Sequence, residues 1–224
     1  MYGFLTGNAL KILAAIAMVC DHAGLMLFPR IPLLRLIGRL AYPIFAFMIA
    51  EGCKYTRSKK RYFGTIFLLA TVCQVVYFIA DGTMYLSILF TFSLSILTIY
   101  ALQNFKAKKN ALSGAVFALT VLAVWGLNQI FTIDYGFWGC MVPVFAAVFQ
   151  NTRYDRIPVH AAMLWVGLLF LAASLGGIQY NAQLAIPLLF CYNGQRGKWN
   201  LKYFFYIFYP VHLVVLQVLQ WIFG

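Results

Sequence analysis

Four ionisable residues lie inside two apolar segments near the start of the chain. Asp21 and His22 fall in the first segment, and Arg35 and Arg39 fall in the second. An ionisable side chain in a bilayer costs a few kcal/mol, about 3 on insertion scales, so these residues are candidates for a functional site. Arg35 and Arg39 are four positions apart on one helix face, where two planar guanidinium groups can bind one phosphate or carboxylate.

Pro29 and Pro32 bracket a tight turn between the two segments, which predicts an antiparallel hairpin. With the turn near residue 30, positions whose numbers sum to about 60 lie at equal depth, because both helices rise equally per residue. His22 is then level with Gly38, between the two arginines, and Asp21 is close enough to neutralise one of them. A structural interpretation stays open, in which a buried ion pair fixes the hairpin and His22 is hydrogen-bonded beside it.

Two further positions extend this set. Lys11 and His22 are eleven residues apart, which returns to within about 20° of the same helix face and separates them by roughly 16 Å. They can engage the two ends of an elongated ligand, or Lys11 can extend to lipid headgroups. His212 follows Pro210, which can bend the last helix, so His212 is either a cavity-lining or a structural histidine.

Other candidates lie near the expected ends of spans. Glu51 is 12 residues beyond Arg39 and rotated by about 120°, so it does not share that arginine's face. We expect it to serve the cytoplasmic mouth or to pair with a loop lysine. His160, after Pro158, is expected at the membrane interface.

Two connecting loops also contain candidate residues. Asp134 and Tyr135 open an outer loop that continues with glycines. The inner loop 192–197 contains Asn193 and Arg196 among glycines, which let backbone N–H groups approach a ligand. Such a loop suits phosphate binding, and it is equally an ordinary turn with an arginine that sets topology.

The composition excludes a water-soluble globule. The 224 residues are 63% hydrophobic and 10% charged, against about 25% charged in soluble domains. Recurring apolar runs of about 20 residues predict an all-α polytopic transmembrane helical bundle, a single membrane domain over 1–224 with about nine spans (eight to ten). The spans near 136–150 and 181–192 are short, so one of them is a candidate re-entrant or broken helix. The expected helices are 8–28, 31–53, 62–80, 84–103, 111–130, 136–150, 159–177, 181–192 and 203–223.

The positive charge predicts orientation. The formal net charge is +12, and basic residues gather in loops at 54–61, 106–109, 153–156 and 196–202. By the positive-inside rule these loops and the N-terminus are cytoplasmic. We therefore expect contact with anionic membrane lipids and not with nucleic acid. Five dispersed cysteines without a C-x-x-C pair indicate packing residues, so no metal site is expected.

Several blocks of residues resemble the TraX family of bacterial membrane proteins, over nearly the whole chain. The first blocks are LTGNALKI at 5–12, Asp21-His22 and RLIGRLAYPIFAF at 35–47. Later blocks are Glu51-Gly52 with Thr56, DYG at 134–136 with Gly139, YNG at 192–194 with RG at 196–197, and FY at 205–206 through YPVHL at 209–213. The Lys11-x10-His22 spacing also looks like an Arg-x10-His arrangement in the acyltransferase-3 family, with Lys in place of Arg.

The TraX resemblance implies an integral protein of the bacterial inner membrane, linked to N-terminal acetylation of conjugative pilin, with acetyl-CoA as the donor. Many relatives are chromosomal, so the acceptor is expected to be a protein N-terminus or a glycan or lipid of the cell envelope. The expected function is a membrane-embedded acyltransferase that moves an acyl group from cytoplasmic acyl-CoA to an acceptor at or across the membrane.

Within that expectation, His22 is the general base that deprotonates the acceptor, and Asp21 or a neighbour sets its tautomer and pKa. His212 is the alternative base, and the sequence does not choose between them. Arg35 and Arg39 would stabilise the oxyanion or orient the acceptor. The remaining candidates are Lys11, Asn193 and Arg196 for the acyl-CoA, and Glu51, Asp134 and Tyr135 for the acceptor.

Two other functions stay open from the sequence. A transporter or flippase would line a path for an anionic solute or lipid with Asp21, His22 and the arginines. A structural membrane subunit would use the buried charges only to specify helix pairing. The sequence contains none of the soluble-enzyme motifs G-x-S-x-G, Walker A and H-E-x-x-H.

Overall fold

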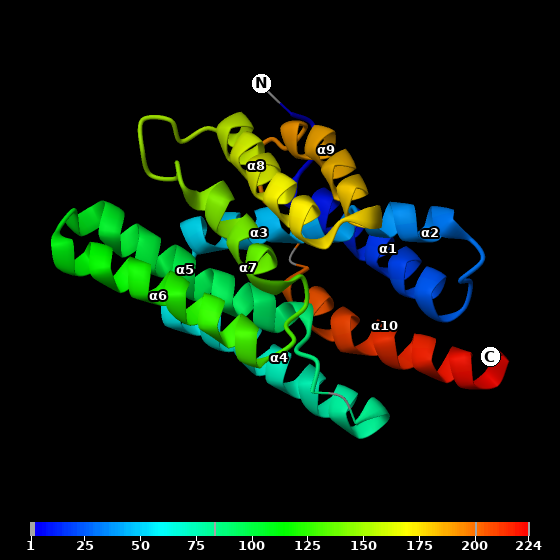
Figure 1. The fold of residues 1–224 in the computed structure, drawn as a ribbon. Helices are drawn as coiled ribbons and strands as arrows, with labels where there is room; N and C mark the ends of the chain where they lie inside the picture. The colour runs from blue at the N-terminus through cyan, green and yellow to red at the C-terminus, as the bar shows by residue number, and fades with distance from the viewer. Residues whose placement is uncertain (1–2, 83, 200, 224) are drawn as a thin grey trace. The chain divides into compact units, whose positions relative to one another are not determined.

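A computed structural model describes residues 3–82, 84–199 and 201–223, without the side chains of 79–81, 202–203 and 223. Helices make up the regular structure of these residues, in which paired extended backbone is limited to two isolated bridges. The elements in chain order are α1 (Gly7–Met26), α2 (Pro32–Gly38), α3 (Ala41–Tyr55), α4 (Lys59–Asp81), α5 (Ile88–Lys108), α6 (Ala111–Ile130), α7 (Gly136–Ala147), α8 (Ile157–Leu175), the 3-10 helix η1 (Gly177–Ala185), α9 (Ile186–Phe190) and α10 (Lys202–Phe223) (Figure 1).

The predicted all-α transmembrane bundle is confirmed. Nine predicted segments occur in order, but the sixth and eighth are short, because α7 has 12 residues and η1 with α9 takes the place of 181–192. The helix predicted over 31–53 corresponds to the helical stretch Pro32–Tyr55, in which an irregularity at residues 39 and 40 separates α2 from α3. Seven helical stretches of the described residues are long and apolar enough to cross a membrane: Gly7–Met26, Pro32–Tyr55, Lys59–Phe78, Ile88–Lys108, Ala111–Ile130, Ile157–Leu175 and Phe204–Ile222.

Two compact units make up the fold. Unit 1 contains Met1–Met48 and Leu175–Gly224, and unit 2 contains Ile49–Ser174. Helix α3 begins in unit 1 and ends in unit 2. The predicted single membrane domain stays a prediction.

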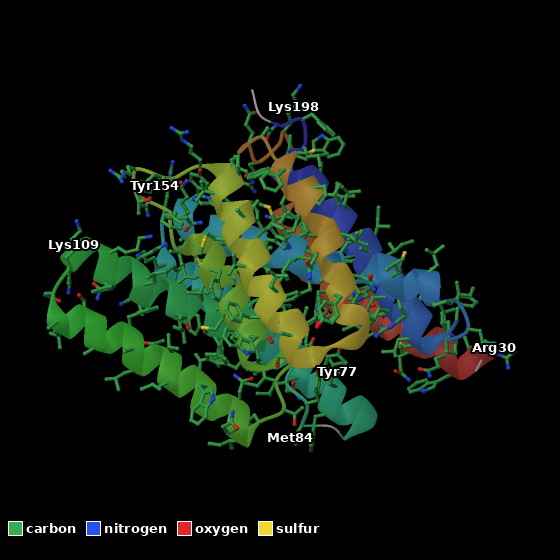
Figure 2. The ribbon with its side chains drawn as sticks, turned by 45° about the horizontal axis from the view of Figure 1, so that its top comes forward. Arg30, Tyr77, Met84, Lys109, Tyr154 and Lys198 are labelled. Atoms are coloured by element: carbon green, nitrogen blue, oxygen red, sulfur yellow. The ribbon has the colours of Figure 1, made fainter. Side chains whose placement is uncertain are left out.

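Unit 1 is built on the hairpin of α1 and α2. A Cβ placed on Gly38 of α2 would collide with the side chain of Asp21 of α1. A Cβ on Gly24 would lie only 2.8 Å from Cβ of Leu34. The two glycines therefore let the helices approach closely. The turn between the two helices lies at Arg30, which Figure 2 labels. The register predicted from this turn sets His22 level with Gly38, and Asp21, which contacts Gly38, is one residue away from it.

The glycine-rich inner loop completes the other end of α1. The N–H of Gly7 donates to the carbonyl of Gln195 at 2.8 Å, and the N–H of Asn8 donates to that of Arg196 at 2.9 Å. Nδ2 of Asn8 donates to the carbonyl of Trp199 at 2.6 Å. First-turn N–H groups have no partner within their own helix, so these loop carbonyls satisfy them.

In unit 2, a lysine closes the C-terminus of α7. The ammonium group of Lys106 in α5 donates to the carbonyls of Ala147, Val148 and Gln150 at 3.1, 2.8 and 2.6 Å. A cation at this end satisfies carbonyls that have no helical partner and interacts favourably with the helix dipole. Lys106 therefore ties the end of α5 to the end of α7.

The loops of unit 2 separate by charge as the sequence predicts. Figure 2 shows Lys109 and Tyr154, from two basic loops, at one end of the unit. Tyr77 and Met84 lie at the other end, beside connections without Lys or Arg. The membrane side that each end faces stays a prediction.

Asp155 closes the loop before α8. Its Oδ1 accepts a hydrogen bond from Nζ of Lys54 at 2.6 Å, and its Oδ2 accepts one from the N–H of Asn151 at 2.8 Å. Partial burial acts to raise the pKa of Asp155, but the bonds from Lys54 and Asn151 outweigh it, so the pKa lies below its ordinary value of 3.8. A lowered pKa stabilises the fold above the ordinary value, and the stabilisation is lost as pH falls through the lowered one.

Replacing Gly38 with Ala is expected to lower the free energy of unfolding by about 1–3 kcal/mol, because the added methyl group has to displace Asp21. Gly126→Ala in α6 is the matched control, since a Cβ there meets no atom within 4 Å and alanine favours a helix. Thermal unfolding in detergent compares the two variants. An unchanged unfolding temperature for Gly38→Ala would contradict the close helix contact.

The Asp155→Asn variant is expected to be less stable than the wild type by up to about 1 kcal/mol at neutral pH, the value of a partly exposed pair. The difference should shrink as pH falls through the lowered pKa of Asp155, where the carboxylate becomes protonated in the folded wild type as well. Unfolding temperatures of both proteins across this pH range measure the effect. A difference that is constant with pH would show that the ion pair is not its cause.

Candidate functional site

Asp21 is the centre of a charge cluster between α1 and α2. Both of its carboxylate oxygens accept hydrogen bonds from Nη2 of Arg39, and its Oδ2 lies 2.9 Å from Nη1 of Arg35. The predicted pairing of Asp21 with one arginine is confirmed and extends to the second. Two guanidinium groups share one carboxylate, which leaves an excess of one positive charge. This excess favours a bound anion or a developing negative charge.

The two arginines differ in what holds them. The Arg39 side chain is 9% exposed, and its Nη1 donates to Oε1 of Gln179 in η1 at 3.1 Å. The Arg35 side chain is 26% exposed, and its Nη1 also donates to the backbone carbonyl of Asp21 at 3.2 Å. Arg39 is fixed from two sides, so Arg35 is better placed to meet a ligand. Gln179 was missed from the sequence, because no local pattern indicates a partner 140 positions away.

Two imidazoles meet in unit 1. The ring centroids of His22 in α1 and His212 in α10 are 5.1 Å apart, with 71° between the ring planes. Nδ1 of His22 lies 2.9 Å from the carbonyl oxygen of Met18, and Nδ1 of His212 lies 3.0 Å from that of Phe208. A carbonyl oxygen only accepts, so we assign the proton to each Nδ1. Nε2 of each neutral ring then carries a lone pair.

The sequence left the choice between His22 and His212 open, and the structure brings both together. Of the two alternatives for fixing the tautomer of His22, Asp21 or a neighbour, the structure favours a neighbour. The arginines engage its carboxylate, and the carbonyl of Met18 takes that role. Nε2 of His212 is buried and, among the described residues, has no hydrogen-bond partner. The pair therefore offers two sites for an incoming proton.

Aromatic side chains position the second histidine. Phe208 lies one turn before His212, and their rings are stacked with centroids 5.2 Å apart and 8° between the planes. Tyr209 meets the same imidazole nearly edge-on at 5.6 Å. Pro210 lies inside α10 between these residues and His212. Because α10 contacts α1 within unit 1, this stack presents His212 to His22.

An apolar groove of about 420 Å³ lies between α1 and the start of α10. Residues from α1 form one wall, and residues between Trp199 and Phe208 form the other. The groove was missed from the sequence, because apolar residues on a membrane helix look the same whether they line a groove or face lipid. Its lining includes Ile12, Ile16, Val19, Cys20, Phe204 and Phe208.

The residues predicted to bind phosphate lie at the inner loop and the start of α1. Lys11 and Arg196 are close enough for their like charges to repel one another. Asn193 has a structural role: its Oδ1 accepts from the N–H of Gln195 at 2.9 Å, and its N–H donates to the carbonyl of Leu5 at 2.9 Å. Binding of acyl-CoA by these residues stays a prediction.

The residues predicted to bind the acceptor lie in unit 2. The phenol of Tyr85 donates to Oδ1 of Asp134 at 2.7 Å, and the hydroxyl of Thr91 donates to the Asp134 carbonyl at 2.6 Å. Burial and the nearby carboxylate of Asp134 raise the pKa of Tyr85 well above its ordinary value, so its phenol stays protonated as the donor. Tyr135 has φ +62° and immediately precedes α7. Both residues shape the turn into α7, and acceptor binding stays a prediction.

Glu51 belongs to a buried cluster in unit 2. Its Oε1 lies 3.5 Å from Nδ1 of His160, whose Nε2 lies 3.1 Å from Oδ1 of Asp155. Lys54, the lysine near the end of α3, forms its ion pair with Asp155 and not with Glu51. The side chain of His160 is buried, at 1% exposed, and its predicted position at the membrane interface stays a prediction. In the described part of the chain, no group of three or more His, Cys, Asp and Glu side chains is arranged to hold a metal ion.

Known proteins are similar in sequence to this chain over more than half of its length. "Probable fimbrial assembly protein FimC, serogroup H1" of Dichelobacter nodosus is 28% identical over 236 aligned positions, covering 92% of each chain. "Uncharacterized protein RP591" of Rickettsia prowazekii (strain Madrid E) is 28% identical over 65% of this chain and 56% of its own. No solved structure matches. The family model described as TraX protein matches residues 6–220, and the chain therefore belongs to the TraX family.

Proposed function

We propose that this TraX-family membrane protein transfers an acyl group, normally acetyl, from cytoplasmic acyl-CoA to an acceptor amine or hydroxyl at or across the bacterial inner membrane. The observation that carries the proposal is the pair His22 and His212, two imidazoles with Nε2 lone pairs next to a cluster with excess positive charge. The family and the relative named for fimbrial assembly favour a pilin N-terminus as acceptor. A glycan or lipid of the envelope is the other acceptor class.

The chemistry assigned to the site needs one base and one oxyanion stabiliser. Nε2 of one histidine takes a proton from the acceptor as its nitrogen or oxygen attacks the thioester carbon. The carbonyl oxygen becomes an oxyanion, which the guanidinium of Arg35 stabilises. The C–S bond then breaks, and the imidazolium returns the proton to the leaving sulfur, giving free coenzyme A and the acylated acceptor.

The donor binds by its charged end at the inner loop. Coenzyme A is polyanionic at its nucleotide end, and the repulsion between Lys11 and Arg196 would be relieved by a bound phosphate. The basic loops are expected on the cytoplasmic side, where acyl-CoA is available. These two cations would therefore select the nucleotide end of the donor.

Substituting the histidine that acts as the base is expected to lower acyl transfer by a factor of about 10² or more, the usual contribution of a general base. His22→Gln and His212→Gln keep a polar side chain but cannot act as the base. The assay follows labelled acetyl groups from acetyl-CoA to a pilin-type peptide with a free N-terminal amine, or to envelope lipid, in proteoliposomes. A loss in one variant alone identifies the base, and full activity in both would refute the assignment.

Replacing Lys11 with Ala is expected to weaken acetyl-CoA binding about tenfold, equivalent to about 1.4 kcal/mol. Calorimetry on the detergent-solubilised protein measures this, with free acetate as the ligand control. Lys60→Ala, which removes an exposed lysine of unit 2, is the matched protein control. An equal effect of both substitutions would mean that only overall charge matters.

A second candidate function is passage of an anionic solute or lipid. It is favoured by the excess positive charge that Asp21 leaves on Arg35 and Arg39, a feature that suits an anion path through a bilayer. Movement of an anion across liposomes without chemical change would support it.

A further inference from the structure

We propose that the apolar groove between α1 and α10 holds the pantetheine arm of the acyl donor. This inference rests on the proposed function, because it takes acyl-CoA as the donor. It adds the path along which the donor runs from the cations at the inner loop to the two histidines. Both helices belong to unit 1 and are drawn in Figure 1 in blue and red.

The groove fills the interval between the charged end and the reacting end. On α1 it is lined from Ile12 to Cys20, the stretch that starts after Lys11 and stops before His22. On α10 its last lining residue is Phe208, which stacks directly on the ring of His212. A ligand with its anionic group at Lys11 and its body in the groove would therefore present its far end to both imidazoles.

The length of the arm matches this interval. Lys11 and His22 are eleven residues apart, which is roughly 16 Å along a helix. The arm of acyl-CoA has about 13 bonds from its phosphate oxygen to the thioester carbon, and an extended chain advances roughly 1.2 Å per bond, giving about 16 Å. An extended arm with its phosphate at Lys11 thus brings the thioester carbon level with His22.

The lining suits the apolar part of the arm. The described residues that line the groove present no polar surface, so the geminal methyl groups and methylenes of pantetheine can pack against Ile12 and Phe204. The groove is open along its length, since Ile16 is 56% exposed and Phe204 is 48% exposed.

Charge sets the direction of the ligand. Lys11 and Arg196 lie at the inner-loop end, and Figure 2 shows Lys198 at the same end of unit 1, opposite Arg30. A phosphate at the other end would lose these cations. The anionic nucleotide is thus assigned to the loop and the thioester to the histidines.

Calorimetry with three ligands tests the proposal: acetyl-CoA, adenosine 3′,5′-bisphosphate as the nucleotide end without the arm, and free acetate. Ile16→Trp fills the groove, and Ile12→Trp is a second blocking variant in case the first disturbs folding. Leu13→Trp is the matched control, because Leu13 is 39% exposed on the same helix and does not line the groove.

Ile16→Trp is expected to lower the affinity for acetyl-CoA at least tenfold and to leave binding of the bisphosphate unchanged. Leu13→Trp should bind both ligands like the wild type. If both blocked variants bind acetyl-CoA like the wild type, the inference is overturned but the donor stands, and the groove belongs to lipid chains. If both lose the bisphosphate as well, the nucleotide and not the arm occupies the groove. A wild type that does not bind acetyl-CoA would overturn the proposed function itself.

Discussion

The contact of Asp21 with Gly38 and with the arginines on both sides of that glycine is the constraint on which unit 1 depends. Charges in a bilayer have to be paired, and Gly38 leaves room for the carboxylate to reach the arginines on both sides of it. Helix α2 ends at Gly38, and Arg39, which keeps helical backbone angles, also bonds to Gln179. The hairpin, the ion pairs and the excess positive charge are therefore one arrangement, and a change in any part affects the others.

This arrangement also decides how the histidines are prepared for chemistry. Because the arginines occupy Asp21, each imidazole bonds instead to a carbonyl one turn earlier in its own helix. Both Nδ1 protons are thus held by rigid backbone, which places the Nε2 lone pairs more reproducibly than a loop would. His212 gains further support from its stack on Phe208, a residue that also lines the groove. The groove, the histidines and the cation cluster therefore come together from three helices, α1, α2 and α10.

The predictable parts of the site were those fixed by local geometry. Two prolines leave few residues for the turn, and a constant helical rise then gives a register that placed His22 level with Gly38, one residue from the observed contact of Asp21 with Gly38. The irregularity after Gly38, at Arg39 between α2 and α3, was not predictable, because the apolar run continues across it. The hydrogen bond of Gln179 and the burial of His160 were not predicted for another reason. Their partners lie far away in the sequence, and hydrophobic periodicity carries no information about such pairs.

Acyl transfer and transport differ in whether a thiol is released. Purified protein in liposomes would receive acetyl-CoA labelled in the acetyl group on the side of the basic loops, together with a peptide acceptor that has a free N-terminal amine. The enzyme reading predicts label bound covalently to the acceptor, with one coenzyme A thiol released per acetyl group. Labelled anion that crosses the bilayer unchanged, with no thiol released, would contradict it and favour a transporter.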